Sequence, residues 1–367
     1  MKLLLSIGFC ITGFTIFLLL RKREHKTIHK FAIAILFLWF IRFLLFYLEK
    51  AVDLTNMPWL FFLDQSLFLL DGVFLFWFSK SLNKEKFSLK RESIHLIPFV
   101  IAVVLTILTV IGLTNAQLNE LSKEVELPKP SIEEIIFIVA ILLQNVIYLF
   151  LSFKKVNRYN QNILSNYSTI DSIQVNWLSV FLKIWGILMV LPLIIYFINY
   201  IYPLVDVAIV GSFLIASFVA AAVYFSVHVI NQYYASSLLN KNEKTSKRTV
   251  QKIDIAELKV AYLKLKEHME LKKPYLDDAL TLSKLSEQID IKPTKLSKVI
   301  KTQTNGNFYD YINDYRVEAI KKELITTKEQ IIIIAYNNGF SSKSTFNKVF
   351  KSSTGDSPSL FRKKFTA

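Results

Sequence analysis

The first 230 residues of the chain contain seven apolar runs, each about as long as a helix that crosses a lipid bilayer. A hydrocarbon core of about 30 Å requires about 20 apolar residues, and a helix satisfies its backbone hydrogen bonds within one segment. The hydrophobic content of 53%, with 30 Phe and 9 Gly, agrees with lipid as the solvent of this part. The predicted transmembrane helices cover residues 3–20, 31–48, 58–78, 94–113, 135–153, 177–201 and 204–230.

The first run has an alternative interpretation as a secretory signal peptide, because Lys2 precedes it. However, no small-residue cleavage pattern precedes the basic cluster at residues 21–23. A retained helix is therefore favoured.

The loops between the runs predict the orientation, because positively charged loops stay on the cytoplasmic side. With the N-terminus outside, the cytoplasmic loops 21–30, 79–93 and 154–176 together hold 13 Lys and Arg. The segments outside the membrane hold four, which are Lys2, Lys50, Lys123 and Lys129. Seven crossings of a bacterial inner membrane would then place residues from 231 onward in the cytoplasm.

Four ionisable side chains lie within the predicted transmembrane helices, where each costs several kcal/mol unless it is paired. Arg42 and Asp64 match in depth near the outer side, and Asp71 and Lys183 match near the inner side. We therefore predict an Arg42–Asp64 pair and a Lys183–Asp71 pair, either as structural contacts or around a polar ligand cavity. Snorkelling of Lys183 to the inner interface is a further alternative.

The residue types disfavour several classes of protein. Cys10 is the only cysteine, so neither a disulfide framework nor a cysteine-based zinc site can form. We find no metal-ligand cluster, nucleophile motif or inverted repeat, and we expect no enzyme activity, no cofactor and no metal. The net charge of +15 divides into +5 for residues 1–230 and +10 for residues 231–367. Such a basic C-terminal part favours a polyanionic partner, either nucleic acid or lipid headgroups.

A polar linker at residues 231–256 is expected to join the membrane domain, residues 1–230, to a soluble domain at residues 257–367. Lysines in residues 240–252 could contact anionic lipid. Beyond the linker, apolar residues recur at helical spacing, starting with Leu258 and Tyr262.

Two short helices joined by a turn are predicted next. Thr281 caps a helix over residues 282–289, and Pro293 opens a second helix that runs to Lys301. The second helix turns apolar residues inward and a polar, basic face outward. This arrangement is what a helix-turn-helix needs in order to place a helix in the major groove of DNA. The outward residues are Thr294, Lys295, Lys298 and Lys301.

The same design repeats after a long amphipathic helix over residues 308–324. A helix over residues 330–338 ends at Gly339, and Ser341 or Ser342 caps a further helix to residue 351. Two copies joined by one stiff helix favour a DNA-binding surface over an ordinary solvated face. The outward residues of the second copy are Lys343, Ser344, Thr345, Asn347, Lys348 and Lys351.

These residues resemble the AraC/XylS family of transcription regulators over residues 273–364. The resemblance implies two recognition helices in successive major grooves of double-stranded DNA, beginning near Thr294 and Ser342. Ser286, where the family usually has Ala, and Lys292, where a capping Ser or Thr is common, depart from the pattern and concern the first copy. The matching residues are Phe308, Tyr311-Ile312, Arg316, Ala319, Leu324, Ile334-Ala335, Gly339-Phe340, Ser342, Ser344, Phe346, Val349-Phe350-Lys351, Thr354-Gly355, Ser357-Pro358 and Arg362.

The predicted fold class is all-α, with a seven-helix transmembrane bundle followed by a soluble double helix-turn-helix domain. We expect a one-component regulator that responds to an unidentified signal at the membrane. Two alternatives stay open: a helix-turn-helix domain that docks a protein in a membrane complex, and a transporter or enzyme with a regulatory tail. A homodimer is possible, although no heptad repeat supports it.

Within this interpretation, the outward residues divide into two groups. We expect Lys343, Ser344, Asn347 and Lys348 to contact bases or their immediate surroundings, because they share one helix face. Contacts with phosphates, which fix the register on DNA, are expected from Lys295, Lys298, Lys301 and Lys351.

Overall fold

The computed structural model describes residues 1–21, 27–51, 59–83, 85–112, 132–171, 173–201, 207–239 and 255–366. Over these ranges the chain forms helices, turns and one isolated antiparallel bridge, between Tyr167 and Thr281, in agreement with the all-α expectation. The helices form two compact units. The membrane unit comprises Met1–Tyr159 and Val175–Tyr234, and the C-terminal unit comprises Asn160–Gln174 and Ala235–Ala367.

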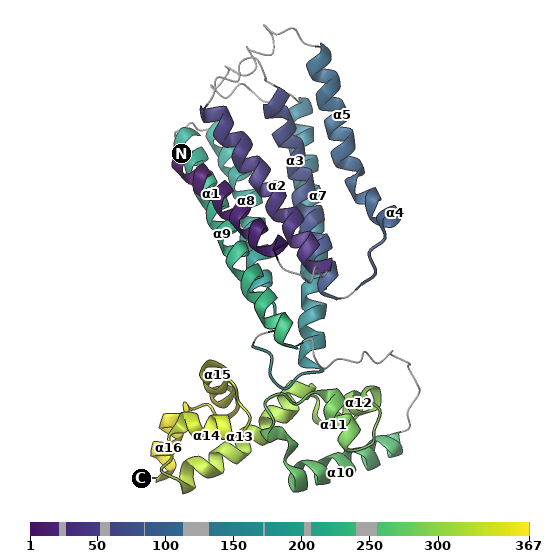
Figure 1. Ribbon diagram of the computed structural model, residues 1–367, viewed down its shortest axis with the longest axis vertical. Helices are drawn as coiled ribbons and strands as arrows, with labels where there is room; N and C mark the ends of the chain where they lie inside the picture. The colour runs from purple at the N-terminus through teal and green to yellow at the C-terminus, as the bar shows by residue number, and fades with distance from the viewer. Residues whose placement is uncertain are drawn as a thin grey trace. The chain divides into compact units, whose positions relative to one another are not determined.

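Long apolar helices make up the membrane unit (Figure 1). In this unit α1 packs along α2, α2 along α3, and α3 along α5. The helices are α1 (Lys2–Leu20), α2 (Thr27–Ala51), α3 (Trp59–Leu82), the short α4 (Leu89–Glu92) and 3-10 helix η1 (Ser93–Leu96), α5 (Ile97–Gly112), α7 (Ile132–Leu164), α8 (Asn176–Ile201) and α9 (Val207–Leu239).

Several of these helices are suited to a bilayer. Within the described residues, five stretches are long and apolar enough to cross a membrane, and α8 contributes a shorter apolar stretch, Asn176–Leu191. The count of seven crossings therefore stays a prediction. The five stretches are Lys2–Leu20, Ile28–Leu48, Leu89–Leu108, Ile135–Leu164 and Gly211–Gln232.

Aromatic side chains from several helices fill the centre of the membrane unit. Trp39 of α2 stacks on Trp185 of α8 with ring centroids 5.0 Å apart, and Phe225 of α9 meets Trp39 edge-on at 5.3 Å. All three side chains are buried. Rings of this size bury much apolar area and prefer offset or edge-on contacts, so they hold the three helices in one arrangement.

The outer faces of α5 and α7 are apolar. Leu105 of α5 is 56% exposed, and Leu143 and Phe150 of α7 are 60% and 68% exposed. Contiguous apolar surface of this kind is unfavourable in water but costs nothing against hydrocarbon. These faces are therefore compatible with contact to lipid.

The C-terminal unit is a set of short helices around α13, with α11 and α12 on one side and α14 to α16 on the other (Figure 1). Two apolar cores lie along α13: Leu285, Ile300 and Ile312 belong to the first core, and Ile320 and Phe350 belong to the second. The helices are α10 (Ile255–Lys272), η2 (Pro274–Leu276), α11 (Leu282–Gln288), α12 (Pro293–Thr304), α13 (Phe308–Thr326), α14 (Ile331–Asn337), α15 (Lys343–Thr354) and α16 (Pro358–Thr366).

Three features differ from the expected organisation. Helix α9 continues to Leu239, so the first nine residues of the expected linker are helical, while its centre, residues 240–254, lies outside the described residues. Helix α16 was not predicted from the sequence, because its nine residues hold too few apolar positions for a clear stripe. Asn160–Gln174, which lies within the expected cytoplasmic loop 154–176, belongs to the C-terminal unit.

Candidate nucleic-acid interface

The first pair of short helices is built as a helix-turn-helix. The Thr281 hydroxyl accepts a hydrogen bond from the Lys284 N–H at 3.2 Å and caps α11, and Pro293 occupies the start of α12. Helix α12 buries Leu296 and Ile300 against α11 and α13. The cap at Thr281 and the start at Pro293 are confirmed, and α12 runs one turn further than predicted, to Thr304.

The residues predicted on the outer face of α12 point away from its buried side. Thr294, Lys298 and Lys301 are exposed. Lys295 is half-buried and forms an ion pair with Glu257 of α10. Lys292 precedes the helix without donating or accepting a side-chain capping bond. Helix α12 therefore presents point charges that suit phosphate groups better than base edges.

The second pair of short helices depends on Gly339. This residue has a φ of +84°, in the left-handed region that glycine adopts without strain. A Cβ at this position would overlap the carbonyl oxygen of Tyr275 and lie 2.9 Å from Arg316 Nε. The turn between α14 and α15 therefore approaches the backbone of the first half so closely that only glycine fits.

Helix α15 carries the second predicted DNA-binding face. The Ser342 hydroxyl lies 3.4 Å from the Thr345 N–H and caps the helix, and Phe346 and Phe350 are buried beneath it. The hydroxyl of the half-buried Thr345 donates a hydrogen bond to Asp171. The other predicted residues of this face are exposed, and they are Lys343, Ser344, Asn347, Lys348 and Lys351.

Arg316 of α13 joins three segments of the C-terminal unit and is 1% exposed. Its guanidinium donates hydrogen bonds to the carbonyl oxygens of Tyr275 at 2.8 Å, Asp277 at 2.9 Å and Ser168 at 3.1 Å. It also donates to the Ser168 hydroxyl and to the Asn313 side-chain oxygen. Burial lowers the pKa of Arg316 to about 10, although the nearby Asp278 and Asp277 carboxylates and Tyr309 favour its charged form.

Sequence reasoning identified Arg316 as part of a family pattern but missed its partners. Ser168 lies 148 residues away and is 1% exposed. The available signal was Arg316 itself, because a buried guanidinium with five N–H donors requires several acceptors. Nothing in the local pattern of residues 160–174 shows where those acceptors lie.

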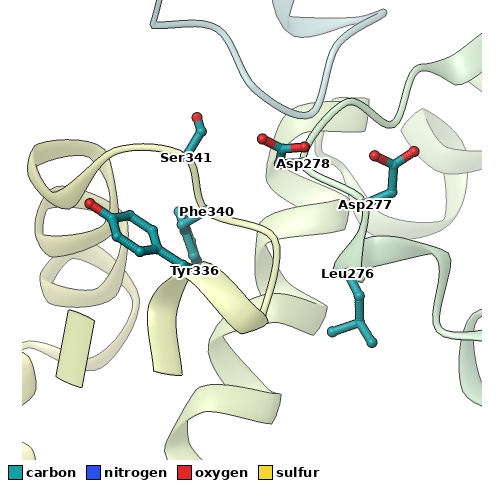
Figure 2. A pocket seen from close by; sticks show the side chains of 6 residues that line it. All are labelled: Leu276, Asp277, Asp278, Tyr336, Phe340 and Ser341. Carbon is teal, nitrogen blue, oxygen red and sulfur yellow. The ribbon is translucent and has the colours of Figure 1, made fainter. Parts of the chain in front are cut away.

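A pocket of about 550 Å³ opens on the C-terminal unit (Figure 2). Asp277 and Asp278 lie on one side of it, and Tyr336, Phe340 and Ser341 lie on the other. The two carboxylates would repel a phosphate placed in this pocket. In the described ranges, no group of three or more His, Cys, Asp or Glu side chains could hold a metal ion.

Three of the four ionisable residues predicted within the transmembrane helices form one cluster, and the fourth, Lys183, lies outside it. Arg42 Nε lies 3.2 Å from Asp64 Oδ1, and Arg42 Nη1 lies 2.8 Å from Asp71 Oδ2. The Trp39 indole N–H also donates to Asp71, at 3.0 Å. The expected Lys183–Asp71 pair does not form, because Arg42 reaches both carboxylates and Lys183 instead lies over the Phe153 ring at 5.8 Å.

Comparison with known proteins identifies the family of the C-terminal region. Residues 285–364, which run from the middle of α11 into α16, match the family model described as a helix-turn-helix domain. The C-terminal unit contains a helix-turn-helix domain. We use this name below for residues 255–366, and the AraC-type resemblance seen in the sequence agrees with the match.

The relatives that share this region are regulators by name. An HTH-type transcriptional regulator of Staphylococcus aureus (strain COL) is 35% identical over 88 residues, which are 24% of this chain and 12% of the relative. The HTH-type transcriptional regulator YobQ of Bacillus subtilis (strain 168) is 34% identical over 88 residues, which are 36% of its length. The chain thus spans well under two thirds of either relative. The solved C-terminal domain of AraT, a response regulator from Geobacillus stearothermophilus, is 25% identical over 28% of this chain and 84% of that domain, with a TM-score of 0.26.

Proposed function

We propose that the protein is a membrane-tethered, sequence-specific DNA-binding transcription regulator that works as a one-component sensor. The observation that carries this proposal is the pair of helices α12 and α15, each with a basic outer face, packed along the single helix α13. Two recognition helices on one stiff support suit two successive major grooves. The names of the relatives point to the same activity.

The proposed contacts divide between the two helices. On α15, Lys343, Ser344, Asn347 and Lys348 contact base edges, because amide, hydroxyl and ammonium groups can distinguish the donors and acceptors of the major groove. Lys351 and the outward residues of α12, which are Thr294, Lys295, Lys298 and Lys301, contact the sugar-phosphate backbone and fix the register.

The apolar helices of the membrane unit anchor the protein in a bacterial inner membrane in this proposal. Seven crossings from an outside N-terminus leave the helix-turn-helix domain in the cytoplasm, where DNA is accessible. The Arg42 cluster acts as a structural contact within the bundle, since the guanidinium reaches both carboxylates where water is absent. A cytoplasmic reporter fused at residue 367 should be active, whereas activity of a periplasmic reporter there would contradict the topology.

The test of DNA binding uses the full chain in lipid nanodiscs and a duplex selected from a random-sequence library. Affinity should fall steeply with salt, by several orders of magnitude between low and moderate salt if about six phosphates are contacted. The double variant Lys343→Glu/Lys348→Glu should abolish most of the binding. Its matched control, Lys266→Glu/Lys272→Glu, makes the same charge change on the exposed face of α10 and should lower affinity far less.

The alternative of a protein-docking module makes the opposite prediction. In that case no duplex is enriched over background, and any residual affinity for DNA depends only weakly on salt. Reversal of the charges at Lys343 and Lys348 then leaves promoter occupancy intact in cells. Any of these results would replace the DNA-binding proposal.

A further inference from the structure

A segment of the chain between two membrane helices is bound to the helix-turn-helix domain. We call residues Asn160–Gln174 the clamp segment; it begins with the last turn of α7 and ends just before α8. The Leu282 N–H donates to the Asn166 carbonyl oxygen at 3.0 Å, and the Ser168 N–H donates to the Leu280 carbonyl oxygen at 3.2 Å. The clamp segment therefore pairs with the start of α11 through one isolated antiparallel bridge, between Tyr167 and Thr281.

Side chains strengthen this pairing. The Ser168 hydroxyl donates to the Leu280 carbonyl oxygen at 2.8 Å, and the Thr169 hydroxyl donates to the Asp278 carbonyl oxygen at 2.7 Å. Arg316 donates to both the carbonyl and the hydroxyl of Ser168. Because Arg316 and Ser168 are each 1% exposed, removing either partner would leave buried polar groups unpaired. The contact is therefore an interface with buried, hydrogen-bonded polar groups and not a superficial contact between exposed side chains.

The same segment reaches the second recognition helix. Asp171 accepts a hydrogen bond from the hydroxyl of Thr345, the third residue of α15. The Asp171 carboxylate also lies close enough to Tyr309 to help burial raise the pKa of that phenol to about 12. A carboxylate is therefore held at the positive end of the helix that is proposed to enter the major groove.

DNA would compete directly with this arrangement. Phosphates favour the N-terminus of a recognition helix, because its first N–H groups point outward and the helix dipole attracts negative charge. The Asp171 carboxylate accepts the hydrogen bond of the Thr345 hydroxyl and places its negative charge at the N-terminus of α15. A duplex that docks on α15 must displace Asp171 or accept electrostatic repulsion.

We propose that the clamp segment is an autoinhibitory contact: while it is docked, Asp171 masks the N-terminus of α15, and its release by the membrane domain frees the helix for DNA. This inference rests on the proposed DNA-binding function. Chain continuity supplies the coupling, since α7 runs directly into the clamp segment and α8 follows it. A rearrangement of α7 and α8 would therefore move the clamp segment relative to the helix-turn-helix domain without the help of a second protein.

The first test compares duplex affinities of the full chain in nanodiscs, with a duplex selected from a random-sequence library by both the wild type and Asp171→Asn. Asp171 is exposed, so this substitution should leave the fold intact. Affinity should rise about three- to tenfold in Asp171→Asn, as expected for removal of one charge from a helix N-terminus. The matched control, Glu270→Gln on α10, removes the same charge from a side chain that is 60% exposed and should change affinity less than twofold.

Two results of this test are distinct. Equal affinity of the wild type and Asp171→Asn for the selected duplex would overturn the autoinhibitory contact and leave the DNA-binding proposal standing. Failure of both proteins to enrich any duplex would overturn the DNA-binding proposal and this inference with it.

A second test locks the contact. In a Cys10→Ser background, which removes the natural cysteine, Asp171→Cys and Thr345→Cys should form a disulfide under oxidation, because the two side chains touch. Oxidation should lower duplex affinity, and reduction should restore it. Absence of the disulfide, or a disulfide that leaves affinity unchanged, would overturn the proposal.

Discussion

The two proposed recognition helices, α12 and α15, share a design but differ in the side chains that they expose. Helix α15 has a hydroxyl cap from Ser342 and exposes hydroxyl and amide groups, among them Ser344 and Asn347, next to its lysines. Helix α12 has no side-chain cap; its exposed residues include Thr294, Lys298 and Lys301, and the half-buried Lys295 is paired with Glu257. In both helices, the third residue is engaged by a carboxylate from outside the helix pair, although only Asp171 comes from beyond residues 255–366.

This difference indicates a division of labour between the copies. Amide and hydroxyl groups in a capped, fixed helix can distinguish base pairs, whereas lysines act as mobile point charges. We therefore expect α15 to supply most of the sequence preference and α12 to supply electrostatic attachment. The variants below test that division, beginning with the support that both helices share.

Arg316→Met should have the largest effect, because it removes the support of both helices at once. Three backbone carbonyl oxygens, those of Tyr275, Asp277 and Ser168, would lose a buried donor. We expect a loss of about 3–5 kcal/mol in the free energy of unfolding, measured by pulse proteolysis in urea. Arg362→Met is the control, since Arg362 is half-buried and donates to the Leu324 carbonyl at 3.2 Å. A similar loss in both variants would refute the special role of Arg316.

Gly339→Ala should destabilise the second copy more than the first. The added Cβ would overlap the Tyr275 carbonyl oxygen in a left-handed turn, at a cost of about 2–3 kcal/mol. Gly355 provides the matched control, because its φ is +80° but no atom lies within 4 Å of its added Cβ. Gly355→Ala should cost about 1 kcal/mol. Hydrogen exchange should show increased opening of α15 before α12, and the reverse order would contradict this prediction.

Asn347→Ala and Lys298→Ala should separate the two binding roles. Loss of the Asn347 amide should relax the preference at one base position by about 1–3 kcal/mol, whereas loss of Lys298 should weaken all sequences alike and reduce the salt slope by about one. Lys351→Ala, on the same helix as Asn347, should behave like Lys298→Ala. Affinities for a panel of single-base variants of the selected duplex measure both effects. Identical affinity profiles for Asn347→Ala and Lys298→Ala would contradict separate roles for the two helices.

Lys292→Ser should have the smallest effect and should be stabilising. Lys292 has the extended backbone of a capping residue, with φ −53° and ψ 137°, but no side-chain bond to the first turn of α12. A serine there should add about 0.5–1 kcal/mol, and Ser342→Ala should remove about as much from α15. Thermal unfolding of the two variants provides the comparison. A destabilising Lys292→Ser would mean that the lysine makes a contact more valuable than a cap.

Local patterns predicted much of the helix-turn-helix domain. The apolar spacing along α12, α13 and α15, the cap at Thr281, the start at Pro293 and the turn at Gly339 are all properties of neighbouring residues. A helix repeats every 3.6 residues, so its buried face can be recognised in a short stretch of sequence. Its ends can be recognised from capping residues in the same stretch. Helix α16 was missed because its apolar residues, Leu360, Phe361 and Phe365, are interrupted by a basic run at residues 362–364.

Contacts between residues far apart in the sequence could not be predicted from local patterns. Depth in the bilayer suggested that Arg42 would take Asp64 and Lys183 would take Asp71, yet one guanidinium reaches both carboxylates because its planar fork has several donors. The depth of a residue in the bilayer does not say which neighbouring helix its side chain faces. Depth therefore could not decide whether Arg42 or Lys183 pairs with Asp71.

The sequence by itself thus determined the apolar helices and the two helix pairs of the helix-turn-helix domain, because both depend on residues a few positions apart. Only the tertiary structure showed that the clamp segment belongs with the helix-turn-helix domain. That contact joins residues more than 100 positions apart, such as Ser168 with Arg316 and Asp171 with Thr345. It arises from matched backbone groups and a single buried guanidinium, which leave no periodic trace along the chain.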